Sequence, residues 1–239
     1  GVAAARNAGL AAARGRYVAP IDADDIWVPC KIEAQMRAVH AHHGTVGLVY
    51  SWFVTMDGQG RIRDYRSTAQ AEGNVLAAMA ERNIVGNGSS PLILREAALA
   101  VGGYDSTLRD RNAEGCEDYK LYFSVAERYP FVLIRDYLMA YRIHHSSMSS
   151  HAARMVRSRA IVTQEIRERH PELSRQLRRG NARARRFLLT RKLRSGTWSE
   201  CLLIARDMLV ADPVYALREL ASFAWHKTLG PLVFPHHPP

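Results

Sequence analysis

Apolar positions along the first 150 residues follow two alternating patterns, one typical of helices and one typical of strands. An Ala-rich helical stretch opens the chain and ends at Gly15, and an apolar run over Tyr17–Ile21 follows it. This run is apolar on both faces, which is typical of strands in a parallel sheet covered by helices. The pattern therefore predicts an α/β fold in which a mixed, mostly parallel sheet is flanked by helices.

The same patterns predict more helices and strands up to about residue 150, and helices alone beyond it. From His151 onward the sequence is helical in pattern and rich in arginine, with no convincing strand. We therefore expect an α/β domain over residues 1–150 and an all-helical extension over residues 151–239. The other elements expected in the first domain are a helix over 29–43, a hairpin over 46–66, a strand over 90–95, a helix over 117–129 and a strand over 131–144.

Three carboxylates, Asp22, Asp24 and Asp25, follow the first predicted strand within four positions. Ligands of parallel α/β sheets lie beyond the carboxyl ends of the strands, where these residues fall. In an extended segment Asp22 and Asp24 point the same way and can bind one cation, while Asp25 is free to cap the next helix. Such oxygen ligands favour Mg²⁺ or Mn²⁺. A structural role stays open, because aspartate also favours turns and helix N-termini.

The net charge of +10 is unevenly distributed along the chain. Residues 1–150 contain 16 Lys and Arg and 16 Asp and Glu, whereas residues 151–239 contain 17 and 7. Two interpretations of the basic extension remain open: contact with an anionic membrane surface, or packing on the first domain with a solvated basic face. The three cysteines are widely spaced, which argues against a zinc site or a disulfide framework.

The stretch ARNAGLAAARGRYVAPIDADDIWVPCKIEAQ closely resembles the DxD region of family 2 glycosyltransferases, which have the Rossmann-like GT-A fold. GGYDSTL, CEDYKLYFSVAERY and YRIHHSSMS follow in the family's order, so the resemblance covers about residues 1–150. It implies inverting, metal-dependent transfer of a sugar from a nucleotide-diphosphate donor, a UDP-sugar first of all, to a glycan or lipid-linked acceptor. The expected products are cell-surface polysaccharide or glycoconjugates. No QxxRW sequence occurs, which favours single-sugar transfer.

The resemblance also implies roles for individual residues. Asp118 is the expected general base, and Asp22 and Asp24 are the expected metal ligands. For Asp118 and its neighbour Glu117, capping of a helix N-terminus is the structural alternative. The resemblance assigns donor contacts to Arg6, Asn7, Asp22, Ala23, Asp24, Arg142 and His144, and we expect acceptor contacts from Glu117 and Trp27.

Strand and helix units are expected to precede Gly1, because the chain begins within a helical pattern where this fold begins with a strand. We therefore expect residues 1–239 alone to fold poorly and to bind the donor weakly. The expected location is the cytoplasm, with contact to the inner face of the membrane. Two other function classes remain: a glycoside hydrolase, which needs no metal, and a nucleic-acid-binding protein that uses its arginines. Nucleic acid is the less favoured partner, because Phe187 is the single aromatic residue within the Arg-rich segment 175–194.

Overall fold

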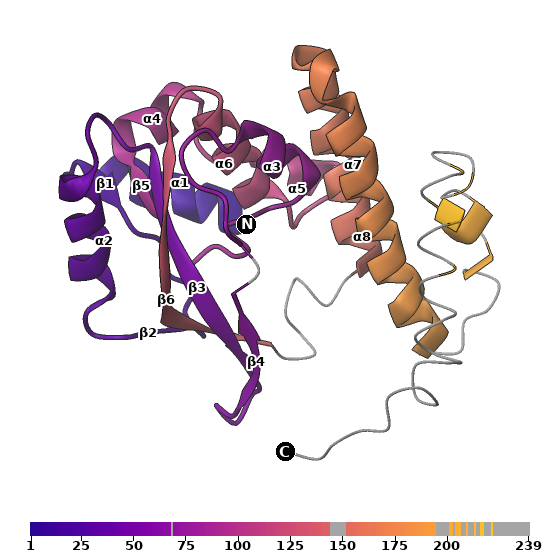
Figure 1. Cartoon of the computed structure of the whole chain (residues 1–239), viewed down its shortest axis with the longest axis horizontal. Coiled ribbons are helices and arrows are strands. Elements are labelled where there is room, and N and C mark those ends of the chain that lie inside the picture. Colours follow the sequence, from indigo (N-terminus) through magenta and orange to yellow (C-terminus); the bar gives the residue numbers. More distant parts are fainter. Residues whose placement is uncertain are drawn as a thin grey trace.

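The computed structural model describes residues 1–67, 69–143 and 152–194, and separate residues between 201 and 221. His144 and most of the chain after residue 194 lie outside the described residues. A sheet with helices on both faces forms the larger part, and two long helices lie beside it (Figure 1). We call the larger part, residues 1–143, the body.

The sheet has six strands in the order β1-β5-β3-β6-β2, with β4 paired to the outer part of β3. It is mixed and flanked by helices, as predicted, but one pairing of five, β3 with β6, is parallel. The sheet is less parallel than expected. β5 is antiparallel to both of its neighbours, β1 and β3. β2 is antiparallel to β6, and β4 is antiparallel to β3. The strands are β1 Tyr17–Val18, β2 Ile26–Trp27, β3 Leu48–Met56, β4 Ile62–Arg66, β5 Leu92–Leu94 and β6 Phe131–Arg142.

The first predicted strand is much shorter than its apolar run. Pairing is limited to Tyr17 and Val18, and Ile21 is 51% exposed. Pro20 has no N–H to donate to a ladder, so pairing cannot continue through it. The prediction of a strand buried on both faces is therefore wrong for residues 19–21. The strand that is buried on both faces is β3. There Leu48 and Tyr50 face the main core, and Val49 faces the second cluster, under α2.

Helices cover the two faces of the sheet unequally. α2 packs on one face, whereas α1, α3, α4 and α6 contribute to the main core on the other. The predicted helices near residues 1–15, 29–43 and 117–129 are present as α1, α2 and α6. The helices of the body are α1 Val2–Ala12, α2 Lys31–Ala41, α3 Leu76–Glu81, α4 Arg95–Ala100, α5 Thr107–Asp110 and α6 Glu117–Ala126.

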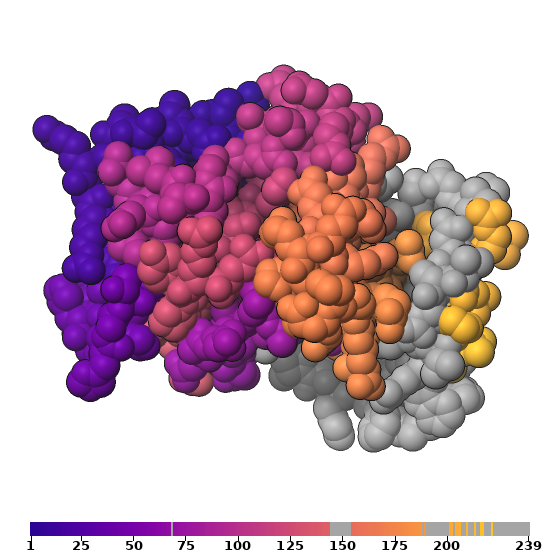
Figure 2. Space-filling model, turned by 90° about the horizontal axis from the view of Figure 1, so that it is seen from above, coloured from indigo at the N-terminus to yellow at the C-terminus, as the bar shows by residue number. Residues whose placement is uncertain are grey.

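Beyond the body, the described residues from 152 to 194 form α7 Ala152–Arg169, the short 3-10 helix η2 Pro171–Leu173 and α8 Ser174–Arg194. Val162 and Ile166 of α7 and Leu177 of α8 are buried in the same core cluster as Phe123 of α6. Figure 2 shows these helices, in orange, lying directly against the body. Among the described helices, none is long and apolar enough to cross a membrane. Membrane contact by the basic extension stays a prediction.

A lysine is buried at the start of α2. The Lys31 side chain is fully buried, its Nζ donates to Gln35 Oε1 at 2.9 Å, and it lies 4.1 Å from the centroid of the Trp27 ring. Gln35 in turn donates to the carbonyl oxygens of Ser90 and Val49. Burial disfavours the charged form and lowers the pKa of Lys31 to about 7.

This burial predicts a pH-dependent stability. Between about pH 7 and the ordinary lysine value of 10.5, the unfolded chain binds the proton that folded Lys31 has lost. The free energy of unfolding should therefore rise with pH across this window, by up to about 1.4 kcal/mol per pH unit. Lys31→Met should flatten this rise, as measured by urea unfolding at pH 6, 8 and 9.5.

Lys120 provides the matched control. Its Nζ lies 2.6 Å from carboxylate oxygens of Asp105 and Glu165, and its pKa is raised by those contacts even though burial opposes the charge. Because its folded pKa lies above the window, Lys120→Met should leave the slope between pH 7 and 9.5 unchanged. An equal slope in wild type and Lys31→Met would contradict the assignment to Lys31.

Candidate active site

The acidic segment after β1 is a turn. The backbone N–H of Asp25 donates to the carbonyl of Asp22 at 3.1 Å, and the backbone N–H of Asp22 donates to Ser89 Oγ at 2.9 Å. The expectation of an extended segment over Asp22 and Asp24 is therefore wrong. Asp24 is exposed and Asp22 is half-buried, and Ala23 lies between them at the tip of the turn.

Asp25 has a different role from the one predicted. Its side chain is buried and accepts a hydrogen bond from the backbone N–H of Arg142 at 2.9 Å. Burial raises the pKa of its carboxyl group, which hydrogen bonds partly offset. It does not cap the next helix, because α2 begins at Lys31 after an N-cap at Cys30. Asp25 instead connects the acidic turn to the end of β6 through this hydrogen bond.

The structure places Arg142 at the acidic turn, and its contact with the donor stays a prediction. Its Nε donates to the carbonyl of Asp24 at 2.8 Å, and its Nη1 donates to the carbonyls of Asp57 and Gly58 at 3.0 and 3.2 Å. The guanidinium thus joins the acidic turn to the turn between β3 and β4. His144 lies outside the described residues, so its role stays a prediction.

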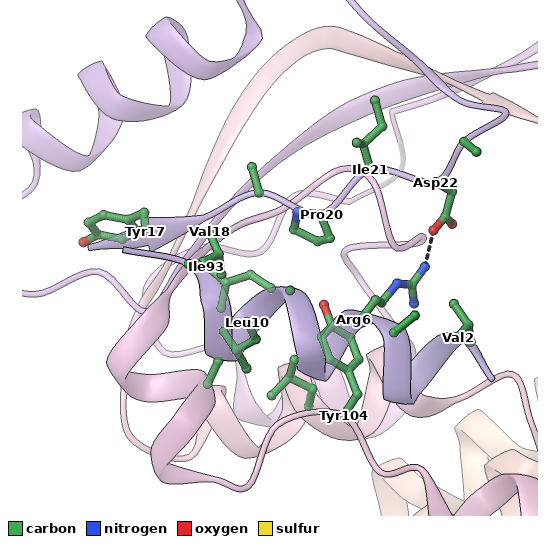
Figure 3. Close-up of a pocket in the computed structure, with 17 residues that line it drawn as sticks. Val2, Arg6, Leu10, Tyr17, Val18, Pro20, Ile21, Asp22, Ile93 and Tyr104 are labelled. Carbon is green, nitrogen blue, oxygen red and sulfur yellow. Dashed lines mark hydrogen bonds and ion pairs between the residues drawn. The ribbon is translucent and has the colours of Figure 1, made fainter. Parts of the chain in front are cut away.

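Arg6 of α1 reaches the acidic turn from the other side. Its Nη2 lies 2.5 Å from Asp22 Oδ1, and its guanidinium stands 5.5 Å from the centroid of the Tyr104 ring (Figure 3). Asn7 supports this arrangement from behind, because its Nδ2 donates to the carbonyl of Tyr104 and its Oδ1 accepts from the Tyr104 N–H. Both polar atoms of Asn7 are used in this way, so its contact in the structure is with Tyr104 and not with the acidic turn.

Asp118 lies in the first turn of α6. Its Oδ2 accepts from Asn83 Nδ2 at 3.3 Å, and its Oδ1 accepts from the Tyr119 N–H at 2.6 Å. Burial raises the pKa of this carboxyl group, and the positive charge of Arg6 lowers it in part. A carboxylate with a raised pKa is suited to accept a proton near neutral pH.

The segment 83–90, NIVGNGSS, connects these residues, and sequence reasoning missed it. Asn83 Oδ1 accepts from the N–H groups of Val85 and Gly86, and Asn87 Oδ1 accepts from those of Ser89 and Ser90. Two consecutive Asx turns therefore shape the segment. The closely spaced Asn, Gly and Ser residues were the available signal, because they mark turns.

Gly88 allows this segment to approach α1. A Cβ atom at this position would lie 2.3 Å from Arg6 Nη2, so a side chain would displace the guanidinium. The segment 83–90 thus contacts three site residues: Asp118 through Asn83, Asp22 through Ser89, and Arg6 at Gly88.

The two expected acceptor residues lie apart from each other. Glu117 is buried, accepts from the Gly115 N–H at 2.8 Å and has a pKa raised by burial. It lines a separate pocket of about 240 Å³ at the start of α1. Trp27 donates from Nε1 to the Ser89 carbonyl at 2.8 Å, so it supports the segment 83–90.

A pocket of about 570 Å³ lies between α1 and residues 17–23. Figure 3 shows Arg6 and Asp22 at one end of it, and Leu10, Val18 and Ile93 further in. The charged end can bind an anion or a cation, whereas the interior is largely apolar. Ala23 also lines this pocket, and its contact with the donor stays a prediction.

The carboxylates of the acidic turn suit a divalent cation that shares its ligands with a substrate. Among the described residues, no group of three or more His, Cys, Asp or Glu side chains is gathered to hold a metal ion. Mg²⁺ is commonly held by one or two carboxylates, with substrate phosphates and water completing its shell. Asp24 is the more exposed of the two carboxylates, and Asp22 is half-buried and paired with Arg6.

Comparisons with known proteins agree with the resemblance of the motifs. The sequence profile described as glycosyltransferase-like family 2 matches residues 1–166. An uncharacterized glycosyltransferase of Methanocaldococcus jannaschii is 26% identical over 145 residues, which are 60% of this chain and 47% of that protein. The matched region is thus about half the length of this relative.

The site predicts a change in the titration of Asp118. Removing the charge of Arg6 by Arg6→Met should raise the pKa of the Asp118 carboxyl group further, because Arg6 is the cation that lowers it. Arg6→Lys keeps the charge and should change the value less. The measurement is a ¹³C NMR titration of the carboxyl group, and an unchanged pKa in Arg6→Met would contradict the coupling.

Proposed function

The chain belongs to the glycosyltransferase-like family 2, and we propose that it transfers a sugar from a nucleotide-diphosphate donor to an acceptor hydroxyl with inversion. The observation that carries the proposal is the line of charges Asp22, Arg6 and Asp118. The first two form an ion pair, and the charge of Arg6 acts on the third, whose pKa burial raises. In this proposal the charges of Asp22 and Arg6 would bind the donor diphosphate with a metal ion, and Asp118 would accept the proton.

The donor diphosphate would lie at the acidic turn. Arg6 supplies a cation there, and Arg142 holds the backbone of Asp24 in place. Asp24, with Asp22, would hold Mg²⁺ or Mn²⁺. When bound, such an ion neutralises the charge that develops on the departing diphosphate. A UDP-sugar is the donor we expect first, by resemblance to the family.

Asp118 would take the proton from the acceptor hydroxyl. The oxygen then attacks the anomeric carbon from the face opposite the diphosphate, so the base and the leaving group must lie on opposite sides of the sugar. Hydrogen bonds from Asn83 and from the Tyr119 N–H fix the orientation of the carboxylate. Its raised pKa increases its basicity relative to an exposed aspartate. The proposed acceptor is a glycan or glycolipid of the cell surface.

The base assignment predicts a loss of turnover in Asp118→Asn. This variant keeps the shape of the side chain and one acceptor oxygen but removes its basicity, so kcat should fall about 10²- to 10⁴-fold. Binding of the donor should stay within about twofold, because the change affects the chemical step. The measurements are release of nucleotide diphosphate from a panel of nucleotide sugars and calorimetry of donor binding. Near-normal turnover would contradict the assignment of Asp118 as the base and favour a role in capping the N-terminus of α6.

The metal assignment predicts dependence on a divalent cation. EDTA should abolish turnover, and Mg²⁺ or Mn²⁺ should restore it in wild type but not in Asp24→Ala. Asp64→Ala is the matched control, because Asp64 is an exposed aspartate of β4 paired with Arg66. It should behave like wild type. Sugar release that persists in EDTA without transfer would contradict the assignment and favour a glycoside hydrolase.

A further inference from the structure

The helix after the body touches the start of α6, where Asp118 lies. Ser158 of α7 is fully buried, and its Oγ accepts the backbone N–H of Cys116 at 3.1 Å. Cys116 is the N-cap residue of α6 and has no side-chain cap of its own. A helix N-terminus leaves N–H groups without partners inside the helix, and Ser158 satisfies one of the N–H groups at this end.

The same helix lies directly on the turn before α6. Gly115 has a φ of +124°, and a Cβ atom there would lie 2.2 Å from Met155 Sδ of α7. Both the backbone conformation and the space therefore require glycine. The first turns of α7 fix the backbone that leads into Glu117 and Asp118.

Arg159, the next residue of α7, contacts the end of α3, two residues before Asn83. Its Nη2 donates to the carbonyl of Glu81 at 3.0 Å, with Ala80 at 3.5 Å, and its guanidinium lies 4.9 Å from the centroid of the Tyr119 ring. These carbonyls end α3, where a cation is favoured by the helix dipole. Asn83, which donates to Asp118, follows two residues later.

Gly180 of α8 packs against the contact between Arg159 and the carbonyl of Glu81. It is buried, and a Cβ atom there would lie 2.2 Å from both Arg159 Nη2 and the carbonyl oxygen of Glu81. Glycine within a helix costs about 1 kcal/mol relative to alanine, so close approach is the physical reason for its presence.

We propose that Ser158 and Arg159 are positioning residues for the reaction. Ser158 holds the start of α6 with Asp118, and Arg159 holds the end of α3 with Asn83, so consecutive residues of α7 align the two groups of the hydrogen bond. The inference rests on the proposed function, and it makes the helical extension part of the catalytic unit.

The proposal predicts a specific loss in kcat. Arg159→Gln and Ser158→Ala should each lower kcat about 10- to 100-fold, because a misplaced base reacts poorly, with the KM for the donor within about twofold. Arg159→Lys keeps one cationic donor and should recover part of the loss. Arg157→Gln is the matched control: Arg157 is exposed on the same helix, and the change removes the same charge. Circular dichroism and thermal midpoints establish that each variant is folded.

A second readout does not need turnover. The charged groups acting on Asp118 include Arg6 of α1, Asp22 of the acidic turn and the neighbouring Glu117 of α6, and all three remain in these variants. Loss of the hydrogen bond from Asn83, which lowers the pKa of Asp118, should move this pKa further above its ordinary value, as followed by ¹³C NMR. This shift in pKa would support the positioning role even if no nucleotide sugar is turned over. A lack of turnover would count against the proposed function alone.

The proposal would be overturned by either of two results. In the first, Arg159→Gln and Ser158→Ala match Arg157→Gln in kcat and in the pKa of Asp118. In the second, activity falls only in proportion to the unfolded fraction, and Arg159→Lys restores none of it. Either result would mean that α7 contributes packing to the structure and does not position Asp118.

Discussion

The guanidinium of Arg6 is the group on which the candidate site depends. It pairs with Asp22, stands over the ring of Tyr104 and acts on the charge of Asp118. Without the cation of Arg6, the carboxylates of Asp22 and Asp118 would lack its compensating charge in a half-buried place, which is costly. Gly88 and Asn7 are best understood as the residues that keep this position open and supported.

The site is built from turns that side chains tie together. Asp25 and Arg142 join the acidic turn to β6, and Arg142 also holds the turn after β3. The segment 83–90 joins Asp22 to Asp118 through Ser89 and Asn83. Because backbone groups make many of these bonds, the arrangement depends on the shape of the loops as much as on the charged residues.

The sequence predicted those parts of the molecule that have a local signal. The apolar periods identified α1, α2, α6 and the hairpin, and the grouping of aspartates located the acidic turn. The role of Asp25 could not be read, because its partner is the backbone of Arg142, which lies 117 positions away. β2 has two residues, too few for a period, and is paired only because β6 is long enough to hold it. The contacts of Ser158 and Arg159 likewise depend on tertiary packing, since nothing in an arginine-rich helix marks which arginine faces inward.

The pairing of β3 with β6 also determines when the site can form. These central strands are separated by more than half of the described body, so their contact requires closure of a long loop before it contributes stability. During synthesis the acidic turn emerges before its partners, so Asp25 has to wait for Arg142, and Cys116 has to wait for Ser158 on α7. Until then the apolar strand β3 lacks its central neighbour, and such exposed strands invite aggregation. The nascent chain is therefore vulnerable between the emergence of β3 and that of β6, and the start of α6 gains its contact with Ser158 only when α7 has left the ribosome.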